Sequence, residues 1–155
     1  RSKMEIERKF LLKNDNWKKS VSHSIHIKQG YISTNPLSVV RIRITDSKAF
    51  LTLKGKGPGI SRPEYEYEIP TQDADEMYNL FCSDSGLVKI RHIVEYKSHK
   101  FEIDEFEGRH KGLIFAEVEL NSETEKIDFP DWIGEEVTGN PQYFNSNLVK
   151  SNNSF

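Results

Sequence analysis

The residues best able to do chemistry in this chain are carboxylates and cations that recur at every second position. Near its start, Glu5 and Glu7 are followed by Lys9, and further along Arg41 is paired in the same way with Arg43. Carboxylate oxygens are preferred ligands of Mg²⁺, while Arg and Lys side chains neutralise phosphate oxygens. The two sets together indicate a site that binds a metal cation beside a polyanion.

The same spacing recurs through the rest of the chain. Its further members are Thr52 and Lys54; Arg62, Glu64, Glu66 and Glu68; Lys89 and Arg91; Glu102 and Asp104; and Glu117 and Glu119. Apolar residues lie between them, so each stretch alternates with the period of a β-strand. Like charges two residues apart on a strand repel at ~7 Å, and a merely solvated sheet face would intersperse the signs. We therefore interpret these positions as the lining of a binding site.

Eight strands are predicted to position these side chains, at residues 4–12, 25–33, 38–45, 49–56, 62–69, 87–96, 100–106 and 113–121. Turn residues separate them, such as Asn35-Pro36 and the glycine-rich stretch 55–59. Helices are expected at residues 15–22, 73–83 with Thr71 as cap, and 141–149 with Asn140 as cap. Because a long open sheet leaves edges that invite aggregation, this pattern favours closure into a barrel.

A barrel with these strands is expected to carry its charges inside. The predicted fold is mainly β (α+β), a closed eight-stranded antiparallel β-barrel, or tunnel, with a charged lumen and a few flanking helices over its apolar outer faces. Small filled barrels have an apolar interior instead, and unpaired charges in a dry lumen are costly. The lumen is therefore expected to hold water or ions.

Length and composition limit the remaining possibilities. The 155 residues fit a single domain, here 4–150, with a frayed tail at 151–155. A net charge of -2 argues against a generally basic surface, so no nucleic-acid partner is expected. No stretch approaches the ~20 apolar residues of a membrane span, so no membrane partner is expected either. The single Cys82 cannot form an intramolecular disulfide, which favours a cytoplasmic location.

Several segments, taken in order, resemble the CYTH domain, or triphosphate tunnel metalloenzyme, superfamily. Glu5-Ile6-Glu7-Arg8-Lys9 resembles the Glu-x-Glu-x-Lys signature that opens this superfamily. Later segments that resemble its successive blocks are Gln29-Gly30-Tyr31-Ile32, Arg41-Ile42-Arg43, Leu51 to Gly55, Arg62 to Glu66, Lys89-Ile90-Arg91, Glu102 to Gly108 and Gly112 to Leu120. The resemblance runs from Met4 to Leu148 and points to the short bacterial tripolyphosphatase-like branch; Phe101, where relatives often carry Trp, is a departure at an apolar position.

That resemblance implies Mg²⁺ or Mn²⁺ as cofactor and a small triphosphate or polyphosphate as substrate. By resemblance Glu5, Glu7 and Glu119 bind the first metal, and Glu66, Asp104 and Glu117 are candidates for a second. The cations expected to bind phosphate are Lys9, Arg41, Arg43, Lys54, Lys89 and Arg91. Lys9, Glu117 and Tyr31 are the candidate catalytic residues, although Tyr31 is equally well explained by packing. Glu64 and Glu68 are expected to pair with lumen cations.

Three functions are consistent with these residues. The first is metal-dependent hydrolysis of inorganic tripolyphosphate or a similar small triphosphate. The second is an adenylate cyclase of the class IV type, which would convert ATP to cyclic AMP and pyrophosphate in the same tunnel. The third is a non-catalytic polyphosphate-binding module, against which the carboxylates argue because anion binding alone does not need them. The sequence also leaves open whether the chain forms a homodimer.

Overall fold

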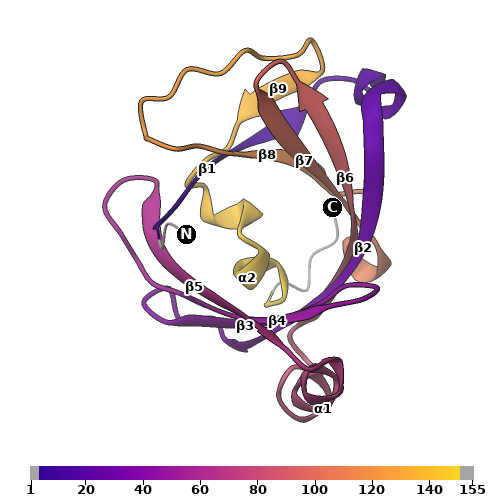
Figure 1. Cartoon of the computed structure of the whole chain (residues 1–155), viewed down its shortest axis with the longest axis vertical. Helices are drawn as coiled ribbons and strands as arrows, with labels where there is room; N and C mark the ends of the chain where they lie inside the picture. Colours follow the sequence, from indigo (N-terminus) through magenta and orange to yellow (C-terminus); the bar gives the residue numbers. More distant parts are fainter. Residues whose placement is uncertain (1–3, 151–155) are drawn as a thin grey trace.

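The computed structural model describes residues 4–150, in which eight antiparallel strands form a closed ring (Figure 1). In chain order they are β1 (Met4–Leu12), β2 (Val21–Ser33), β3 (Val39–Ile44), β4 (Ala49–Lys54), β5 (Ser61–Ile69), β6 (Gly86–Tyr96), β7 (His99–Phe106) and β8 (Ile114–Glu119). Around the ring the order is β5-β4-β3-β2-β6-β7-β8-β1, and pairing of β1 with β5 closes it. The predicted barrel is confirmed; the largest difference in strand ends is at β2, which begins four residues before position 25.

A ninth strand, β9 (Ile133–Glu136), was not predicted, because its four residues do not alternate between apolar and polar types. It pairs with the second half of β1, along the same edge whose first half pairs with β5. Its Glu136 accepts hydrogen bonds of 2.9 and 2.7 Å from Arg8, the one charged residue on the apolar face of β1. The Arg8 guanidinium also lies 5.4 Å from the ring centre of Phe129. The strand therefore explains why β1 carries a cation on its outer face.

Helix α1 (Thr71–Phe81) packs on the outside of the barrel, at the bottom of Figure 1. It buries Ala74, and Cys82 just beyond its end, against Ile42 of β3 and Ala49 of β4. The contact with β2 is so close that a Cβ at Gly30 would lie 2.4 Å from the Cβ of Cys82. The helix begins at Thr71, so the prediction that Thr71 caps a helix starting at residue 73 was wrong. The helix expected at 15–22 is a short 3-10 turn, η1 (Asn16–Ser20), whose Trp17 is buried.

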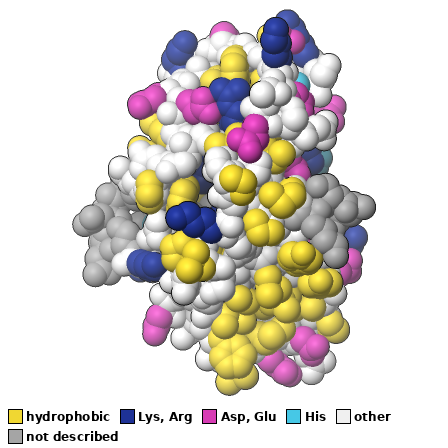
Figure 2. Space-filling model, turned by 90° about the vertical axis from the view of Figure 1, so that its left-hand side faces the viewer, with side chains coloured by type: hydrophobic (Ala, Val, Ile, Leu, Met, Phe, Trp, Pro, Cys, Tyr) yellow, Lys and Arg dark blue, Asp and Glu magenta, His cyan; other side chains and the backbone are white. Residues whose placement is uncertain are grey.

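The expectation that helices cover the apolar outer faces holds only in part. On the outer side of β4 and β5, Leu53 and Tyr67 are exposed to 41% and 53%. Figure 2 shows hydrophobic side chains gathered toward the end of the molecule at which α1 lies. Because the apolar sides of these strands face outward, their charged sides face the interior of the ring.

The C-terminal segment lies inside the ring of strands (Figure 1). A continuous helix was predicted at 141–149, but the segment forms a 3-10 turn, η3 (Pro141–Tyr143), and a short helix, α2 (Asn145–Leu148), separated by an extended Phe144. The Asn140 side chain caps η3 as predicted, accepting from the Gln142 backbone N–H. Leu148 and Val149 pack with Tyr31, Val39, Phe106 and Phe115 in one apolar cluster. The segment thus fills part of the barrel interior.

A third 3-10 turn, η2 (Gly108–His110), joins β7 to β8 and contacts this segment. His110 is buried and its Nε2 lies 2.9 Å from the Leu148 carbonyl oxygen, while Arg109 donates to the carbonyl of Val149. The tail predicted at 151–155 lies outside the described residues. Among residues 4–150, no helix has the length and apolar character needed to cross a membrane.

Candidate active site

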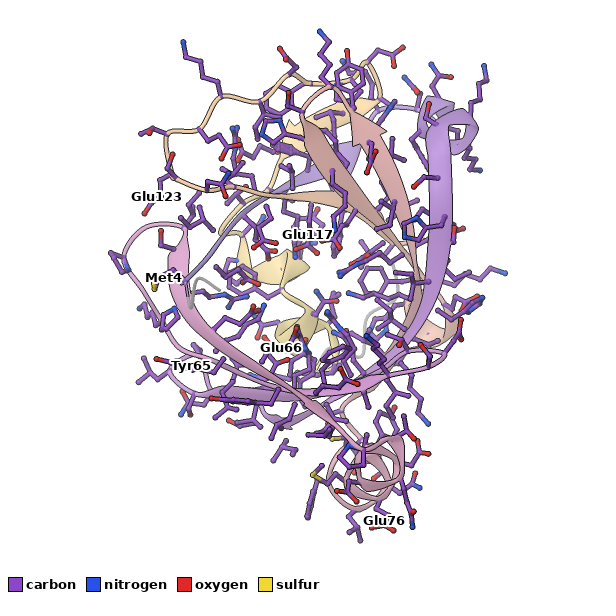
Figure 3. All side chains as sticks on the ribbon, viewed as in Figure 1. Met4, Tyr65, Glu66, Glu76, Glu117 and Glu123 are labelled. Carbon is purple, nitrogen blue, oxygen red and sulfur yellow. The ribbon has the colours of Figure 1, made fainter. Side chains whose placement is uncertain are left out.

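A cavity of about 730 Å³ lies inside the barrel, next to the C-terminal segment. Its charged lining consists of Glu5, Glu7, Lys9, Arg41, Arg43, Lys54, Lys56, Arg62, Glu64, Glu66, Arg91, Glu102, Glu117 and Glu119. Figure 3 shows Glu66 of β5 and Glu117 of β8 pointing into the ring, whereas Tyr65, the neighbour of Glu66 on β5, points outward. The charged lumen expected from the strand pattern is therefore present.

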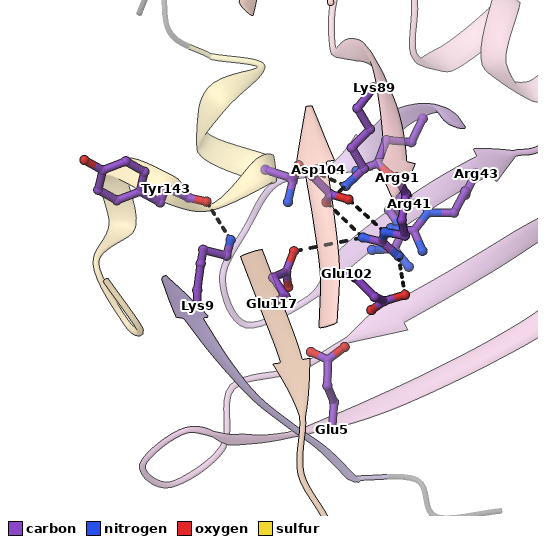
Figure 4. Close-up of polar contacts among 12 residues, drawn as sticks. Glu5, Lys9, Arg41, Arg43, Lys89, Arg91, Glu102, Asp104, Glu117 and Tyr143 are labelled. Atoms are coloured by element: carbon purple, nitrogen blue, oxygen red, sulfur yellow. Dashed lines mark hydrogen bonds and ion pairs between the residues drawn. The ribbon is translucent and has the colours of Figure 1, made fainter. Parts of the chain in front are cut away.

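The structure brings the predicted site residues together in this cavity, with two exceptions. All of the predicted metal, phosphate-binding and catalytic residues line it except Lys89 and Asp104. These two are fully buried, and Lys89 Nζ lies 2.7 Å from Asp104 Oδ2. Arg91 donates to both oxygens of Asp104 at 2.8 and 3.0 Å (Figure 4). Asp104 therefore does not line the cavity itself, but contacts Arg91, which does.

Those contacts also set the ionisation of Asp104. Burial alone would raise the pKa of its carboxyl, but the adjacent Arg91 and Lys89 lower it below its usual range. A buried carboxylate held by two cations fixes their positions in turn. Arg91 approaches two further acids of the lumen, Glu102 at 3.3 Å and Glu117 at 3.9 Å.

Strands β1 and β8 form an acidic wall. Their register places Glu7 opposite Glu119 and Lys9 opposite Glu117. Burial, and then the nearby charges of Glu117 and Glu5, raise the pKa of Glu7 well above its usual value. The carboxyl groups of Glu7 and Glu117 therefore lie close enough to affect each other's ionisation. The neighbouring carboxyl groups of this wall therefore disfavour the charged form of Glu7.

The carboxyl group of Glu5, two residues from Glu7, lies next to cations instead of other carboxyl groups. Lys54 Nζ lies 2.8 Å from Glu5 Oε2, and Arg62 Nε lies 3.2 Å from its Oε1. Burial would raise the pKa of Glu5, but these two cations hold it well below the usual range. Lys54 Nζ also lies 3.3 Å from Glu64 Oε2, so Glu64 pairs with a lumen cation, as the sequence predicted.

Strands β3 and β6 supply a basic wall, made of Arg41, Arg43 and Arg91. Arg41 donates to Thr52 at 3.2 Å and lies 3.6 Å from Glu66, but its buried Nε has no hydrogen-bond partner among the described residues. Burial, followed by repulsion from Arg41 and Arg91, lowers the pKa of Arg43 to about 10. Clustered guanidinium groups with a free donor favour a bound anion.

Two cations of the lumen, the buried Lys9 and the half-buried Arg43, contact neutral acceptors instead of carboxylates. Lys9 Nζ donates to the Tyr143 carbonyl at 2.7 Å (Figure 4), and Arg43 Nε donates to Gln29 Oε1 at 3.0 Å. Within residues 4–150, neither has a carboxylate within ion-pair distance, whereas Arg41, Lys54 and Arg91 each have at least one. The charge of Arg43 is therefore available to a ligand, while that of Lys9 also lowers the pKa of Glu117.

Several lining residues were not predicted as site residues. Lys56 belongs to the loop after β4, and Arg62 was read only as part of a charged face. Asn145, Ser146 and Asn147 reach the cavity because the C-terminal segment lies inside the barrel. Gln29, which is fully buried behind the cavity surface, was also missed, because it is uncharged, although it precedes Tyr31 by two positions on the same strand. That i and i+2 spacing was the signal that could have found it.

The acidic wall fits a hard divalent cation. Among the described residues, no three His, Cys, Asp or Glu side chains already converge as a metal-binding group. Mg²⁺ retains several waters, however, and needs only one or two carboxylates together with substrate phosphates. A cation beside these crowded carboxyl groups would relieve their repulsion, and the all-oxygen donors suit Mg²⁺ or Mn²⁺ better than Zn²⁺.

Comparisons with known proteins agree with this geometry. The CYTH domain family model matches residues 3–150. An inorganic triphosphatase of Acetivibrio thermocellus is 44% identical over 147 residues, covering 95% of this chain and 94% of that protein. An inorganic triphosphatase of Nitrosomonas europaea is 36% identical over 153 residues, covering 95% and 97%. A crystal structure of an inorganic triphosphatase superposes with a TM-score of 0.67 at 30% identity, over 95% of this chain and 98% of that one.

Proposed function

This chain belongs to the CYTH domain family, and from that premise we propose that it is a metal-dependent inorganic triphosphatase. Its substrate would be tripolyphosphate or a similar small triphosphate, bound in the barrel cavity. The observation that carries the proposal is the placement of uncompensated cations and crowded carboxylates on facing parts of one cavity. The relatives described above, which are inorganic triphosphatases, support the same activity.

The phosphate chain would be bound by Lys9, Arg41, Arg43, Lys54 and Arg91. Phosphoryl transfer depends mostly on positioning and on neutralising the charge of the transferred group. Arg41 and Arg43 suit this role because Arg41 has an unpartnered Nε and Arg43 has no carboxylate partner in the described part of the chain. Lys89, behind the cavity surface, would support Arg91 through Asp104.

The metal, Mg²⁺ or Mn²⁺, would be held by Glu5, Glu7 and Glu119, with Glu66 and Glu117 as candidates for a second ion. A bound divalent cation neutralises phosphate oxygens and lowers the pKa of bound water. Asp104, the third candidate for the second ion, has both oxygens engaged by Arg91 and Lys89, which favours a supporting role.

Lys9, Tyr31 and Glu117 remain our candidates for catalysis, because all three line the cavity. Lys9 and Glu117 are opposite one another in the β1–β8 register, and Lys9 lowers the pKa of Glu117 against the effect of burial. Glu117 would therefore stay ionised and able to orient water. We place the enzyme in the cytoplasm, which its one free and buried thiol, Cys82, supports.

Phosphorus NMR of the products tests this function against its alternatives. With Mg²⁺ present, tripolyphosphate should give orthophosphate and pyrophosphate. Conversion of ATP to cyclic AMP and pyrophosphate, with tripolyphosphate left intact, would identify a cyclase. Binding of tripolyphosphate without turnover, with either metal, would identify a binding module and refute the proposal.

A further inference from the structure

A single buried carboxamide connects two residues of the cavity wall. Gln29 lies on β2 and is fully buried. Its Oε1 accepts from Arg43 Nε at 3.0 Å, and its Nε2 donates to the Tyr31 hydroxyl at 3.1 Å. Since a guanidinium can only donate, the amide oxygen must face Arg43 and the amide nitrogen must face Tyr31. The orientation of the carboxamide is therefore fixed by chemistry.

The neutral amide leaves the charge of Arg43 intact. Gln29 and Arg43 are direct cross-strand partners on β2 and β3, at a position where an acidic residue would form an ion pair. Other cations of the barrel are held in that way: Lys54 by Glu5, and Lys89 and Arg91 by Asp104. Gln29 holds the Arg43 side chain by one hydrogen bond without neutralising it.

The same amide also determines which hydrogen bonds the Tyr31 hydroxyl can make. Because the hydroxyl oxygen accepts from Gln29, its own hydrogen is left for another acceptor. Tyr31 and Arg43 line the cavity, whereas Gln29 lies behind them. One side chain thus directs two donors from neighbouring strands toward the same space.

We propose that Gln29 is a positioning residue, which orients the Arg43 guanidinium and the Tyr31 hydroxyl toward the phosphate chain while keeping the Arg43 charge uncompensated. This inference rests on the proposed function, because the phosphate chain is the ligand of that cavity. A carboxylate in the same place would pair with Arg43 and would take the Tyr31 hydrogen for itself. Both donors would then be lost to the substrate.

Gln29→Glu tests this directly, since it replaces the amide by a carboxylate of the same shape. We expect KM for tripolyphosphate, and Kd for its imido analogue, to rise at least about tenfold, the effect of one such lost contact. The matched control is Gln72→Glu on α1, an exposed position with the same change in charge, which should keep wild-type constants. In an Arg43→Ala background, Gln29→Glu should weaken analogue binding little further if Gln29 acts through Arg43.

A second measurement does not depend on activity. In ¹⁵N NMR spectra the Arg43 Nε–H of the wild type should exchange slowly with solvent, and Gln29→Leu should accelerate that exchange. A wild type that hydrolyses tripolyphosphate, with unchanged constants in Gln29→Glu, would overturn the inference and leave the proposed function standing. Should Gln29→Glu fail to fold, unchanged Arg43 exchange and unchanged analogue affinity in Gln29→Leu would overturn it. A wild type without turnover would reject the proposed function, and the exchange data would still report the Gln29–Arg43 contact.

Discussion

At the scale of single residues, the lumen charges differ in how far the protein neutralises them itself. Glu5 is paired with Lys54 and Arg62, whereas Glu7 adjoins other carboxyl groups. Arg91 is tied to Asp104, whereas Arg43 contacts a neutral amide. Substitutions of paired and unpaired residues should therefore have different effects on stability and on turnover.

Glu5→Gln and Glu119→Gln should each lower kcat sharply and weaken its dependence on metal concentration, because both are proposed metal ligands. Steady-state rates measured over a range of Mg²⁺ concentrations check this. Glu95→Gln, at an exposed position on β6, is the control and should change stability by no more than ~0.5 kcal/mol. Wild-type rates in both lumen variants at saturating metal would remove these residues from the metal site.

Arg43→Ala and Arg91→Ala form a matched pair. Each should raise KM and lower kcat, since charge on the phosphate chain is neutralised in both the ground state and the transition state. Arg91→Ala should also destabilise the fold, by up to ~3 kcal/mol, because it removes a cation from the buried Asp104. Kinetics and urea unfolding of the two variants separate these effects. Equal unfolding free energies, or unchanged kinetics in both, would contradict the assignment.

At the scale of secondary-structure elements, the sequence predicts the strands whose polar and apolar residues alternate. Eight strands follow from their period of two, and that period also places Glu5, Arg43 and Glu117 on the inner face. It does not predict β9, whose place depends on pairing with β1 and on the Arg8–Glu136 contact. Nor does it place α2 inside the barrel, because that depends on the cluster that Leu148 joins with Phe106 and Phe115. Such contacts join residues far apart in the chain.

The attachment of β9 should depend on pH. Hydrogen bonds from Arg8 and Thr138 lower the pKa of Glu136 from its ordinary value of 4.5. The unfolded chain therefore binds more protons below that value, and the stability contributed at neutral pH is lost as the pH falls. Because the pair is partly exposed, Glu136→Gln should cost less than ~1 kcal/mol at pH 7 and progressively less below pH ~4.5.

Urea unfolding at several pH values measures this difference. Glu135→Gln is the control: it is the exposed neighbour on β9 and has no ion pair among the described residues. It should match the wild type throughout. A destabilisation by Glu136→Gln that persists unchanged at low pH would show that the ion pair is not its cause.

At the scale of the whole molecule, the closed barrel brings like charges together before a ligand binds. Arg41, Arg43 and Arg91 repel one another, and burial adds to the cost. A ligand that binds only the folded state contributes about 2.7 kcal/mol at a hundredfold excess over Kd. At about 2–4 °C per kcal/mol for a chain of this size, the imido analogue with Mg²⁺ should raise Tm by roughly 5–10 °C. Sulfate at matched ionic strength should not raise Tm in this way; an equal shift with sulfate would contradict specific binding of a phosphate chain in the lumen.

The most direct test of the central claim is phosphate release from tripolyphosphate by the purified wild-type protein, measured as EDTA is added and the metal is then restored. Turnover should fall to the background rate in excess EDTA and return with either Mg²⁺ or Mn²⁺. Glu5→Gln should show a much lower rate after restoration, while Glu95→Gln should recover like the wild type. Full turnover in excess chelator, or no turnover at any concentration of either metal, would contradict the account of a cavity in which carboxylates and cations act together on a triphosphate.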